Sequence, residues 1–266
     1  MDRREAGEGW CDPMGKIMVI ANQKGGVGKS TTAVNLGACL ASMGKRVLVI
    51  DVDPQGNATT GLGIHKPDLK QCIYDVLINE VPIQEVILPT PVEGLFIAPA
   101  TERLVGAEIE LVGMMSREQK MRFALMPVKE DYDFFLIDCP PSLGNLTINA
   151  LTAADSVLIP IQCEFYALEG VSQLQRTIQL VQKYSNPGLK IQGVVMTMYD
   201  GRTKLSQQVI DNVKTFFPDR VYSSVIPRNV RLSEAPSHGL PITMYDSRSR
   251  GAEAYIDLAK EVIKSA

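Results

Sequence analysis

The segment from Lys24 to Thr31 combines glycines, lysines and hydroxyl side chains in a spacing that suits phosphate groups. Glycines let the backbone curl so that successive N–H groups point toward phosphate oxygens. Lys29 would place its charge on the β- and γ-phosphates, and the Ser30 hydroxyl would be a ligand for Mg²⁺. A glycine-rich structural turn is the alternative, but an apolar run before the segment and a helical pattern after it favour a nucleotide site. The residues expected to contact nucleotide here are Lys24, Gly25, Gly26, Val27, Gly28, Lys29, Ser30 and Thr31.

Carboxylates follow two apolar runs that are expected to be strands. The run 46–51 ends in Asp51 and continues to Asp53, and the run 134–138 ends in Asp138. Because parallel strands end at one edge of a sheet, these carboxylates should lie beside the phosphates. Asp138 is therefore predicted to hold Mg²⁺ through its water shell. Aspartates at strand ends are often turn residues, but two such segments together with the glycine-rich loop favour a catalytic site.

Short apolar runs alternate with longer helical patterns along the chain. Strands are expected at 16–21, 46–51, 95–98, 134–138, 156–161, 191–197 and 222–226, and helices at 29–43, 117–128, 146–153, 168–184, 204–216 and 251–265. Most of the expected strands are apolar throughout, which indicates a mainly parallel sheet covered on both faces. Gly44 is expected to end the first helix. The prediction is a single-domain α/β P-loop NTPase fold with a doubly wound, mainly parallel sheet and helices on both faces.

Length and composition are consistent with this fold. The chain has 266 residues, of which 45% are hydrophobic and 21% charged, as in a soluble globular protein with one large domain. Its five cysteines are scattered and include no C-x-x-C pair, so neither a disulfide framework nor a zinc site is expected. A reduced cytoplasm fits this cysteine usage.

The N-terminal segment differs in character from the rest. Residues 1–13 are polar and acidic, unlike the apolar core of a signal peptide, and no stretch of the sequence is apolar for long enough to span a bilayer. We expect a disordered extension over residues 1–13 and the folded domain over residues 14–266. Either Met1 or Met14 could be the true start.

Charge is unevenly distributed along the chain. The net charge is −3, which taken alone argues against binding to nucleic acid. Residues 183–250, however, contain ten Lys or Arg and five Asp or Glu, so this stretch carries +5 and the remainder −8. A basic surface near the C-terminal end is therefore expected.

Long blocks of sequence extend these observations into a family resemblance. From Met14 to its C-terminus the chain resembles the ParA/Soj family of chromosome-partitioning ATPases, through the blocks ANQKGGVGKSTT, VDPQGNATTGLG, DCPPSLG, EFYALEG, VMTMYDGRT and IPRNVRLSEAPSHG. Gln23 stands where an ordinary Walker A motif has glycine, and the additional Lys24 is similar to the deviant Walker A motif of ParA and MinD proteins. In that motif the second lysine reaches across a dimer interface to the partner's nucleotide.

The resemblance implies Mg²⁺-dependent hydrolysis of ATP with a slow basal rate. Lys24, Lys29 and Asp53 would be catalytic, with Asp53 orienting or activating the attacking water. Asp51 would support the magnesium region beside Ser30 and Asp138. The match also implies that Pro227 and Asn229 contact the adenine, although an ordinary proline-bearing loop is an equal alternative.

The same resemblance implies a switch that works on DNA. ATP would produce a homodimer that coats double-stranded DNA without sequence preference in a cytoplasmic, nucleoid-associated cycle, and a ParB-type centromere-binding protein would stimulate hydrolysis. Arg202 and Arg231 match the DNA-contact positions of the family, and Lys204, Arg228, Arg248 and Arg250 are possible supplements. Any of these six could instead be an ordinary solvated side chain.

Two other functions in the wider superfamily are alternatives for this sequence. A MinD-like ATPase that cycles on membranes shares the deviant loop and ends in a basic amphipathic helix. The C-terminal helix here is amphipathic, with a mixed polar face, so core packing is the favoured interpretation of Tyr255, Leu258, Ala259, Val262 and Ile263. Iron–sulfur relatives need paired cysteines, which this sequence lacks. His65 and His238 are interpreted as structural or surface residues. Sequence leaves open the partner's binding face, chromosomal or plasmid cargo, regulatory roles and filament formation.

Overall fold

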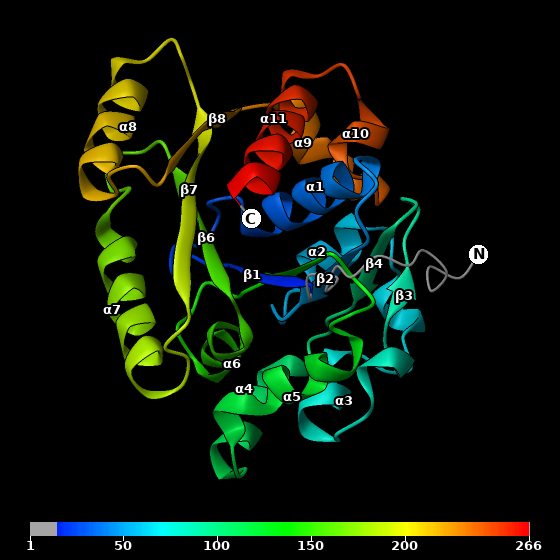
Figure 1. Cartoon of the computed structure of the whole chain (residues 1–266). Helices are drawn as coiled ribbons and strands as arrows, with labels where there is room; N and C mark the ends of the chain where they lie inside the picture. The colour runs from blue at the N-terminus through cyan, green and yellow to red at the C-terminus, as the bar shows by residue number, and fades with distance from the viewer. Residues whose placement is uncertain (1–14, 266) are drawn as a thin grey trace, which may run out of the picture.

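The computed structural model describes residues 15–265, which form one eight-stranded sheet flanked by helices (Figure 1). The strand order is β3-β4-β2-β5-β1-β6-β7-β8. The strands are β1 (Lys16–Ile20), β2 (Val47–Asp51), β3 (Leu88–Pro89), β4 (Leu95–Ala98), β5 (Phe134–Asp138), β6 (Ser156–Gln162), β7 (Lys190–Tyr199) and β8 (Val221–Pro227). All seven strands expected from the sequence are present. The expected N-terminal extension, residues 1–13, lies outside the described residues.

Every neighbouring pair of strands is parallel except β3 and β4. β3 is only two residues long and contains Pro89. It was not expected from the sequence, because two residues carry no alternation of apolar and polar side chains. The parallel strands all point their C-terminal ends to one edge of the sheet, where a ligand site is expected.

Eleven α-helices are present within the described residues. They are α1 (Lys29–Ser42), α2 (Asn57–Gly61), α3 (Ile73–Ile78), α4 (Leu104–Glu110), α5 (Lys120–Leu125), α6 (Asn145–Ala153), α7 (Glu169–Tyr184), α8 (Lys204–Phe216), α9 (Val230–Glu234), α10 (Ile242–Tyr245) and α11 (Arg250–Ser265). The short helices α2, α3, α4, α9 and α10 were not expected. Gly44 follows α1 with φ of +80°, so the expected helix stop is confirmed.

The helix expected over 117–128 is wrong as a single element. The structure has a 3₁₀ turn at Arg117–Gln119, then α5, then a second 3₁₀ turn at Met126–Val128. Met126 keeps αR backbone angles, but Pro127 has no backbone N–H to donate, so the α-helical hydrogen-bond pattern stops before it.

One apolar layer lies on each face of the sheet, as the continuous apolar strands predict. One contains side chains of α1, α10 and α11, and the other contains side chains of α3 to α8. Figure 1 shows these two groups of helices on different sides of the sheet. β2, β5 and β6 are buried along their whole length. Tyr255, Leu258, Ala259 and Val262 of α11 are also buried, which confirms that its apolar side belongs to the core. None of the helices within residues 15–265 has the length and apolar character needed to cross a membrane.

Candidate functional site

The glycine-rich loop joins β1, near the centre of the sheet, to the start of α1. Gly26 and Gly28 have φ of +73° and +89°, a conformation that side chains with Cβ rarely adopt. Gly28 is the N-cap of α1, and its carbonyl accepts the Thr32 N–H at 2.9 Å. The loop therefore presents backbone N–H groups and a helix N-terminus at the C-terminal edge of the sheet.

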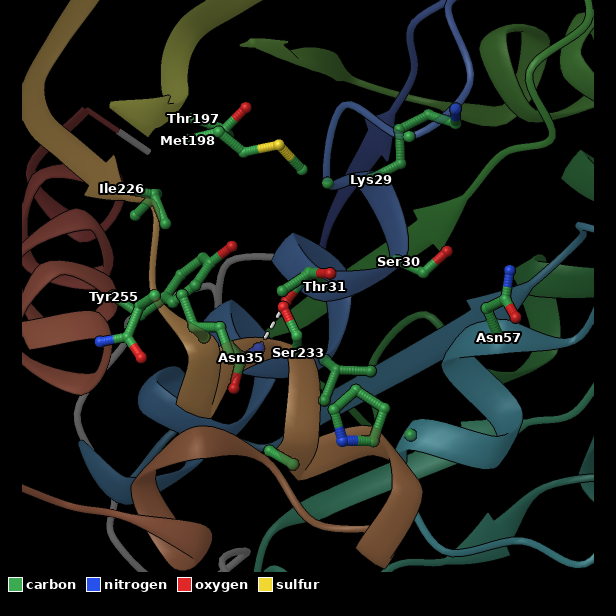
Figure 2. Close-up of a pocket in the computed structure, with 18 of the residues that line it drawn as sticks. Lys29, Ser30, Thr31, Asn35, Asn57, Thr197, Met198, Ile226, Ser233 and Tyr255 are labelled. Atoms are coloured by element: carbon green, nitrogen blue, oxygen red, sulfur yellow. Dashed lines mark hydrogen bonds between the residues drawn. The ribbon is translucent and has the colours of Figure 1, made fainter. Parts of the chain in front are cut away.

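This loop lines a cavity of about 820 Å³. Six of the eight residues predicted to contact nucleotide contribute to its wall, namely Gly25, Gly26, Gly28, Lys29, Ser30 and Thr31. The other two, Lys24 and Val27, are not among the lining residues. Figure 2 shows Met198, Ile226 and Tyr255 on one side of the cavity and Ser30 and Asn57 on the other. The cavity thus has an apolar side and a polar side, as a nucleotide requires.

The two lysines of the loop have different partners. Lys29 is only 6% exposed, and its Nζ donates a hydrogen bond to the Lys24 carbonyl at 3.1 Å. Burial lowers the pKa of Lys29, and the nearby carboxylates of Asp138 and Asp53 act in the opposite direction. The Lys24 ammonium instead forms an ion pair with Glu164 Oε2 at 3.0 Å. Lys29 is thus placed at the cavity, whereas the Lys24 side chain is held by the segment after β6.

The predicted acidic residues meet at the edge of the sheet. Asp51 and Asp138 are register partners at the ends of β2 and β5, and both are fully buried. Burial raises the pKa of Asp138 well above its usual range, and the neighbouring Asp51 raises it further. Neither side-chain oxygen of Asp138 has a hydrogen-bond partner among the described residues. A buried carboxylate left without donors needs another partner, such as a cation and its water shell.

Asp51 differs from Asp138 because protein donors satisfy it. Its Oδ2 accepts hydrogen bonds from the Thr59 N–H at 2.8 Å and the Thr59 hydroxyl at 2.7 Å, and its Oδ1 accepts one from the Asp53 N–H at 3.1 Å. Burial nevertheless raises the pKa of Asp51 to about 6. Asp53 lines the cavity and accepts the Gln55 N–H at 2.9 Å. Asp51 therefore fixes the backbone that carries Asp53.

Magnesium fits the donor set at this edge. The unsatisfied Asp138 oxygens and the Ser30 hydroxyl are hard oxygen ligands, which Mg²⁺ prefers. No group of three or more His, Cys, Asp or Glu within residues 15–265 forms a complete metal site. That arrangement suits an ion that keeps most of its waters and binds the phosphates of a substrate.

The opposite wall of the cavity comes from the ends of β7 and β8. Pro227 and Asn229, the predicted adenine contacts, both line it. Met198 was missed by the sequence reasoning, although it also lines the cavity and has φ of +52°. Thr197, beside it, donates from Oγ1 to the Val27 carbonyl at 2.9 Å and so attaches β7 to the phosphate loop. No sequence pattern marks these two residues, because their role depends on strands far apart in the chain meeting at one edge.

Other missed lining residues include Asn35, Asn57 and Tyr255. Tyr255 could not be separated by its spacing from the other apolar side chains of α11. Its hydroxyl lies 3.2 Å from Thr32 Oγ1, which connects α11 to α1 beneath the loop.

The six predicted DNA-contact side chains are all exposed. Arg202 forms an ion pair with Asp200 at 2.7 Å, and its guanidinium lowers the pKa of Asp200 to about 2. Arg231 pairs with Glu234 at 2.9 Å and lies 3.6 Å from Asp246. The other four predicted contacts have no carboxylate oxygen of the described residues within 4.0 Å of their side-chain nitrogens. They are Lys204, Arg228, Arg248 and Arg250. Exposed ion pairs of this kind contribute little to stability.

The histidines have local partners. His65 lies 3.0 Å from Asp68, and His238 stacks on Tyr245 with ring centroids 4.9 Å apart.

Comparisons with known proteins agree with the fold. Residues 15–191 match the AAA_31 family, described as an AAA domain. The sporulation initiation inhibitor protein Soj of Bacillus subtilis is 65% identical over 249 residues, which are 94% of this chain and 98% of that protein. The chromosome partitioning protein ParA of Myxococcus xanthus is 53% identical over 256 residues, which are 96% of this chain and 90% of that protein.

A solved structure is similar over the same length. Cobyrinic acid a,c-diamide synthase from Mycobacterium smegmatis, with bound ADP and magnesium, has a TM-score of 0.84 and 38% identity, covering 94% of this chain and 95% of that one. The extent of the match to the sequence relatives, together with the deviant phosphate loop, shows that this chain belongs to the ParA/Soj family of chromosome-partitioning ATPases.

Proposed function

We propose that this protein is an ATP-dependent dimerisation switch that binds DNA without sequence preference. The observation that carries the proposal is the different placement of the two loop lysines. Lys29 lines the cavity of its own protomer, whereas Lys24 does not line it and pairs with the half-exposed Glu164. A cation at the rim of a phosphate site is available to the nucleotide of a second copy. ATP would then hold the homodimer together, and hydrolysis would release it.

Hydrolysis to ADP and phosphate follows from the groups around the cavity. Lys29 binds the β- and γ-phosphates. Ser30, and Asp138 through water, would hold Mg²⁺, which would offset negative charge on those phosphates. Asp53 orients the attacking water from its position on the cavity wall. Pro227 and Asn229 contact the adenine on the opposite wall. Basal turnover is slow because one protomer lacks the second positive charge that Lys24 provides to its partner.

DNA binding uses the exposed basic side chains. Arg202 and Arg231 contact phosphates, with Lys204, Arg228, Arg248 and Arg250 adding charge. Arg228 is close in space to the end of β7, because its N–H donates to the Tyr199 carbonyl at 2.9 Å. Phosphate contacts position a protein without reading sequence, so binding is indifferent to sequence and sensitive to salt. A ParB-type protein completes the cycle by stimulating hydrolysis at the nucleoid.

The testing experiment measures binding to an unrelated DNA duplex at two salt concentrations, with ATP, with ADP and without nucleotide. Wild type should bind only with ATP, and more weakly at high salt. Asp53→Ala should keep the ATP-bound, DNA-bound state because the water is no longer oriented. Absence of DNA binding under every condition would reject the proposal, and ATP-dependent binding to liposomes instead would favour the MinD-like cycle.

A further inference from the structure

A second cavity, of about 310 Å³, lies at the edge of the sheet where β1, β6 and β7 begin. Within residues 15–265, no residue lines both this cavity and the nucleotide cavity, which lies at the opposite edge. Its volume is at the lower end of the range for small-molecule sites. The polar side chains that line it are Lys16, Asp155, Ser156, Asn186, Lys190 and Gln192. We call it the N-edge cavity.

Strand register brings three of these side chains together on one face of the sheet. Ser156 pairs with Lys190 on β7 and with Met18 on β1. Paired residues of neighbouring strands point to the same face, and so do residues two apart along one strand. Because Lys16 precedes Met18 by two positions, Lys16, Ser156 and Lys190 share a face at the start of three adjacent strands.

Ser156 has a buried hydroxyl that lacks a partner. The residue is 2% exposed, and its Oγ has no hydrogen-bond partner among the described residues. A buried hydroxyl without a partner costs free energy, so most such groups are paired with protein, water or a ligand. Ser156 lines the N-edge cavity, and a ligand there would supply the missing partner.

The two lysines of the N-edge cavity are also without partners. Within residues 15–265, no carboxylate oxygen lies within 4.0 Å of the Lys16 or Lys190 ammonium, and neither ammonium donates a hydrogen bond. Burial lowers the pKa of Lys16, the charge of Lys190 lowers it further, and Asp155 acts in the opposite direction. An anion bound beside both ammonium groups would relieve their repulsion.

The Asp155 carboxylate is engaged with other groups. Its Oδ2 accepts the Ile17 N–H at 2.8 Å, and its Oδ1 lies 3.9 Å from the Lys129 ammonium. Lys129 therefore offsets the negative charge of Asp155. The charges of Lys16 and Lys190 remain to attract a ligand.

Helix ends near the N-edge cavity do not need the lysines either. Asn186 Nδ2 donates to the Leu151 carbonyl at 3.0 Å and to the Ala154 carbonyl at 2.6 Å, at the end of α6. Gln192 Nε2 donates to the Ser265 carbonyl at 2.6 Å, at the end of α11. Side-chain amides thus satisfy these carbonyls, which lysines often serve at helix ends.

We propose that the N-edge cavity binds a phosphate group, either as inorganic phosphate or on a small phosphorylated molecule. Two ammonium groups match the charge of nearly −2 that such a group carries near neutral pH, and the Ser156 hydroxyl donates to one of its oxygens. Duplex DNA is not the expected occupant, because Arg202 and Arg231 follow the other ends of β7 and β8. The proposal does not depend on the proposed ATPase function.

Binding is tested by equilibrium dialysis of the full chain against radiolabelled inorganic phosphate at constant ionic strength. Mg²⁺ and a saturating non-hydrolysable ATP analogue fill the nucleotide cavity. Wild type should bind about one phosphate per chain. Lys190→Gln and Ser156→Ala should each weaken binding about fivefold or more, as for a lost charge-assisted hydrogen bond. Lys183→Gln, which removes an exposed lysine outside the N-edge cavity, should not.

Stability separates a local effect from misfolding. Ser156→Ala removes a hydroxyl that is unsatisfied without ligand, so in phosphate-free buffer its melting temperature should equal or exceed that of wild type. A clear drop would show that the hydroxyl is already paired within the protein, which would overturn the proposal.

Two further arms identify the phosphate and its place. Glycerol 3-phosphate that displaces the label at lower concentration than unlabelled phosphate favours a phosphorylated small molecule, and the reverse order favours free phosphate. Displacement by duplex DNA would overturn the proposal. So would absence of binding, an equal loss in Lys183→Gln, or binding lost in Lys29→Ala but kept in Lys190→Gln, which would put the phosphate in the nucleotide cavity. Failure to bind the ATP analogue would instead contradict the proposed function, and Lys29→Ala would still locate the phosphate.

Discussion

Asp51 and Asp138 lie opposite each other at the ends of neighbouring parallel strands, yet only Asp51 has hydrogen-bond donors from the described residues. Two equally buried carboxyl groups at equivalent strand positions therefore have different roles. Asp51 holds the backbone of the loop after β2, and Asp138 is left for a ligand. This division leads to the first two predictions.

Asp138→Asn should stabilise the nucleotide-free protein near neutral pH. A buried carboxyl whose folded pKa is raised binds its proton more tightly in the folded state, so stability falls as pH rises from about 4 toward the folded pKa. The neutral amide removes this loss. In EDTA at pH 7.5 the melting temperature should rise by about 3 °C or more, as expected for roughly 1 kcal/mol in a domain of this size.

The gain in Asp138→Asn should shrink as the pH falls toward about 4, because protonation of the wild-type carboxyl removes the cost of burying its charge. The same variant should lose Mg²⁺-dependent ATP turnover. A lower melting temperature at pH 7.5, together with normal turnover, would show that Asp138 is satisfied within the protein and is not the metal carboxylate.

Thr59→Val should destabilise the fold. The Thr59 hydroxyl donates to Asp51 and accepts the Ala100 N–H at 2.9 Å, so valine leaves two buried groups without that partner. We expect a loss of about 2–4 kcal/mol in the free energy of unfolding, measured by urea titration. Thr60→Val is the control, because Thr60 is exposed and bonds only to the Gly56 carbonyl. Similar losses in the two variants would argue against a special role for the Asp51 network.

Lys24→Ala and Lys29→Ala should separate dimerisation from nucleotide binding. Lys29→Ala removes the cavity lysine and should weaken ATP binding by about 10–100-fold, as for a charge-assisted contact. Lys24→Ala should still bind ATP as a monomer but should not dimerise. Calorimetry and sedimentation with a non-hydrolysable ATP analogue measure the two effects. Normal dimerisation and turnover in Lys24→Ala would remove this lysine from the proposed switch.

Arg202→Ala should reduce the salt dependence of DNA binding. Each phosphate contact adds about one to the slope of log affinity against log salt, so the slope should fall by about one. ATP binding should not change. Arg122→Ala on α5 removes an exposed arginine outside the basic stretch and should leave the slope as in wild type. If the slope is identical in all three proteins, Arg202 does not touch DNA.

The sequence predicted the elements that carry local signals. Continuous apolar runs identified the seven parallel strands, and glycine spacing identified the phosphate loop between β1 and α1. The edge strand β3 and the five short helices carried too few residues for a periodic pattern to emerge. Pro127 is the sequence signal that the helix predicted over 117–128 is interrupted.

Local sequence patterns could not predict which distant segments contribute side chains to the cavity. Thr197 and Met198 reach the cavity only because β7 follows β6 in the sheet, and the Lys24–Glu164 ion pair joins residues 140 positions apart. The acidic residues were found because both follow strands. Asp51 differs from Asp138 because Thr59 donates hydrogen bonds to it, and no spacing rule in the sequence predicts that contact.

The two-residue strand β3 has a consequence for colloidal behaviour. A long exposed edge strand offers unpaired N–H and C=O groups that recruit strands of other molecules into aggregates. Here the sheet edge beyond β4 ends in a very short antiparallel strand whose Pro89 has no N–H to donate. This side of the sheet therefore gives an incoming chain almost no template for strand addition.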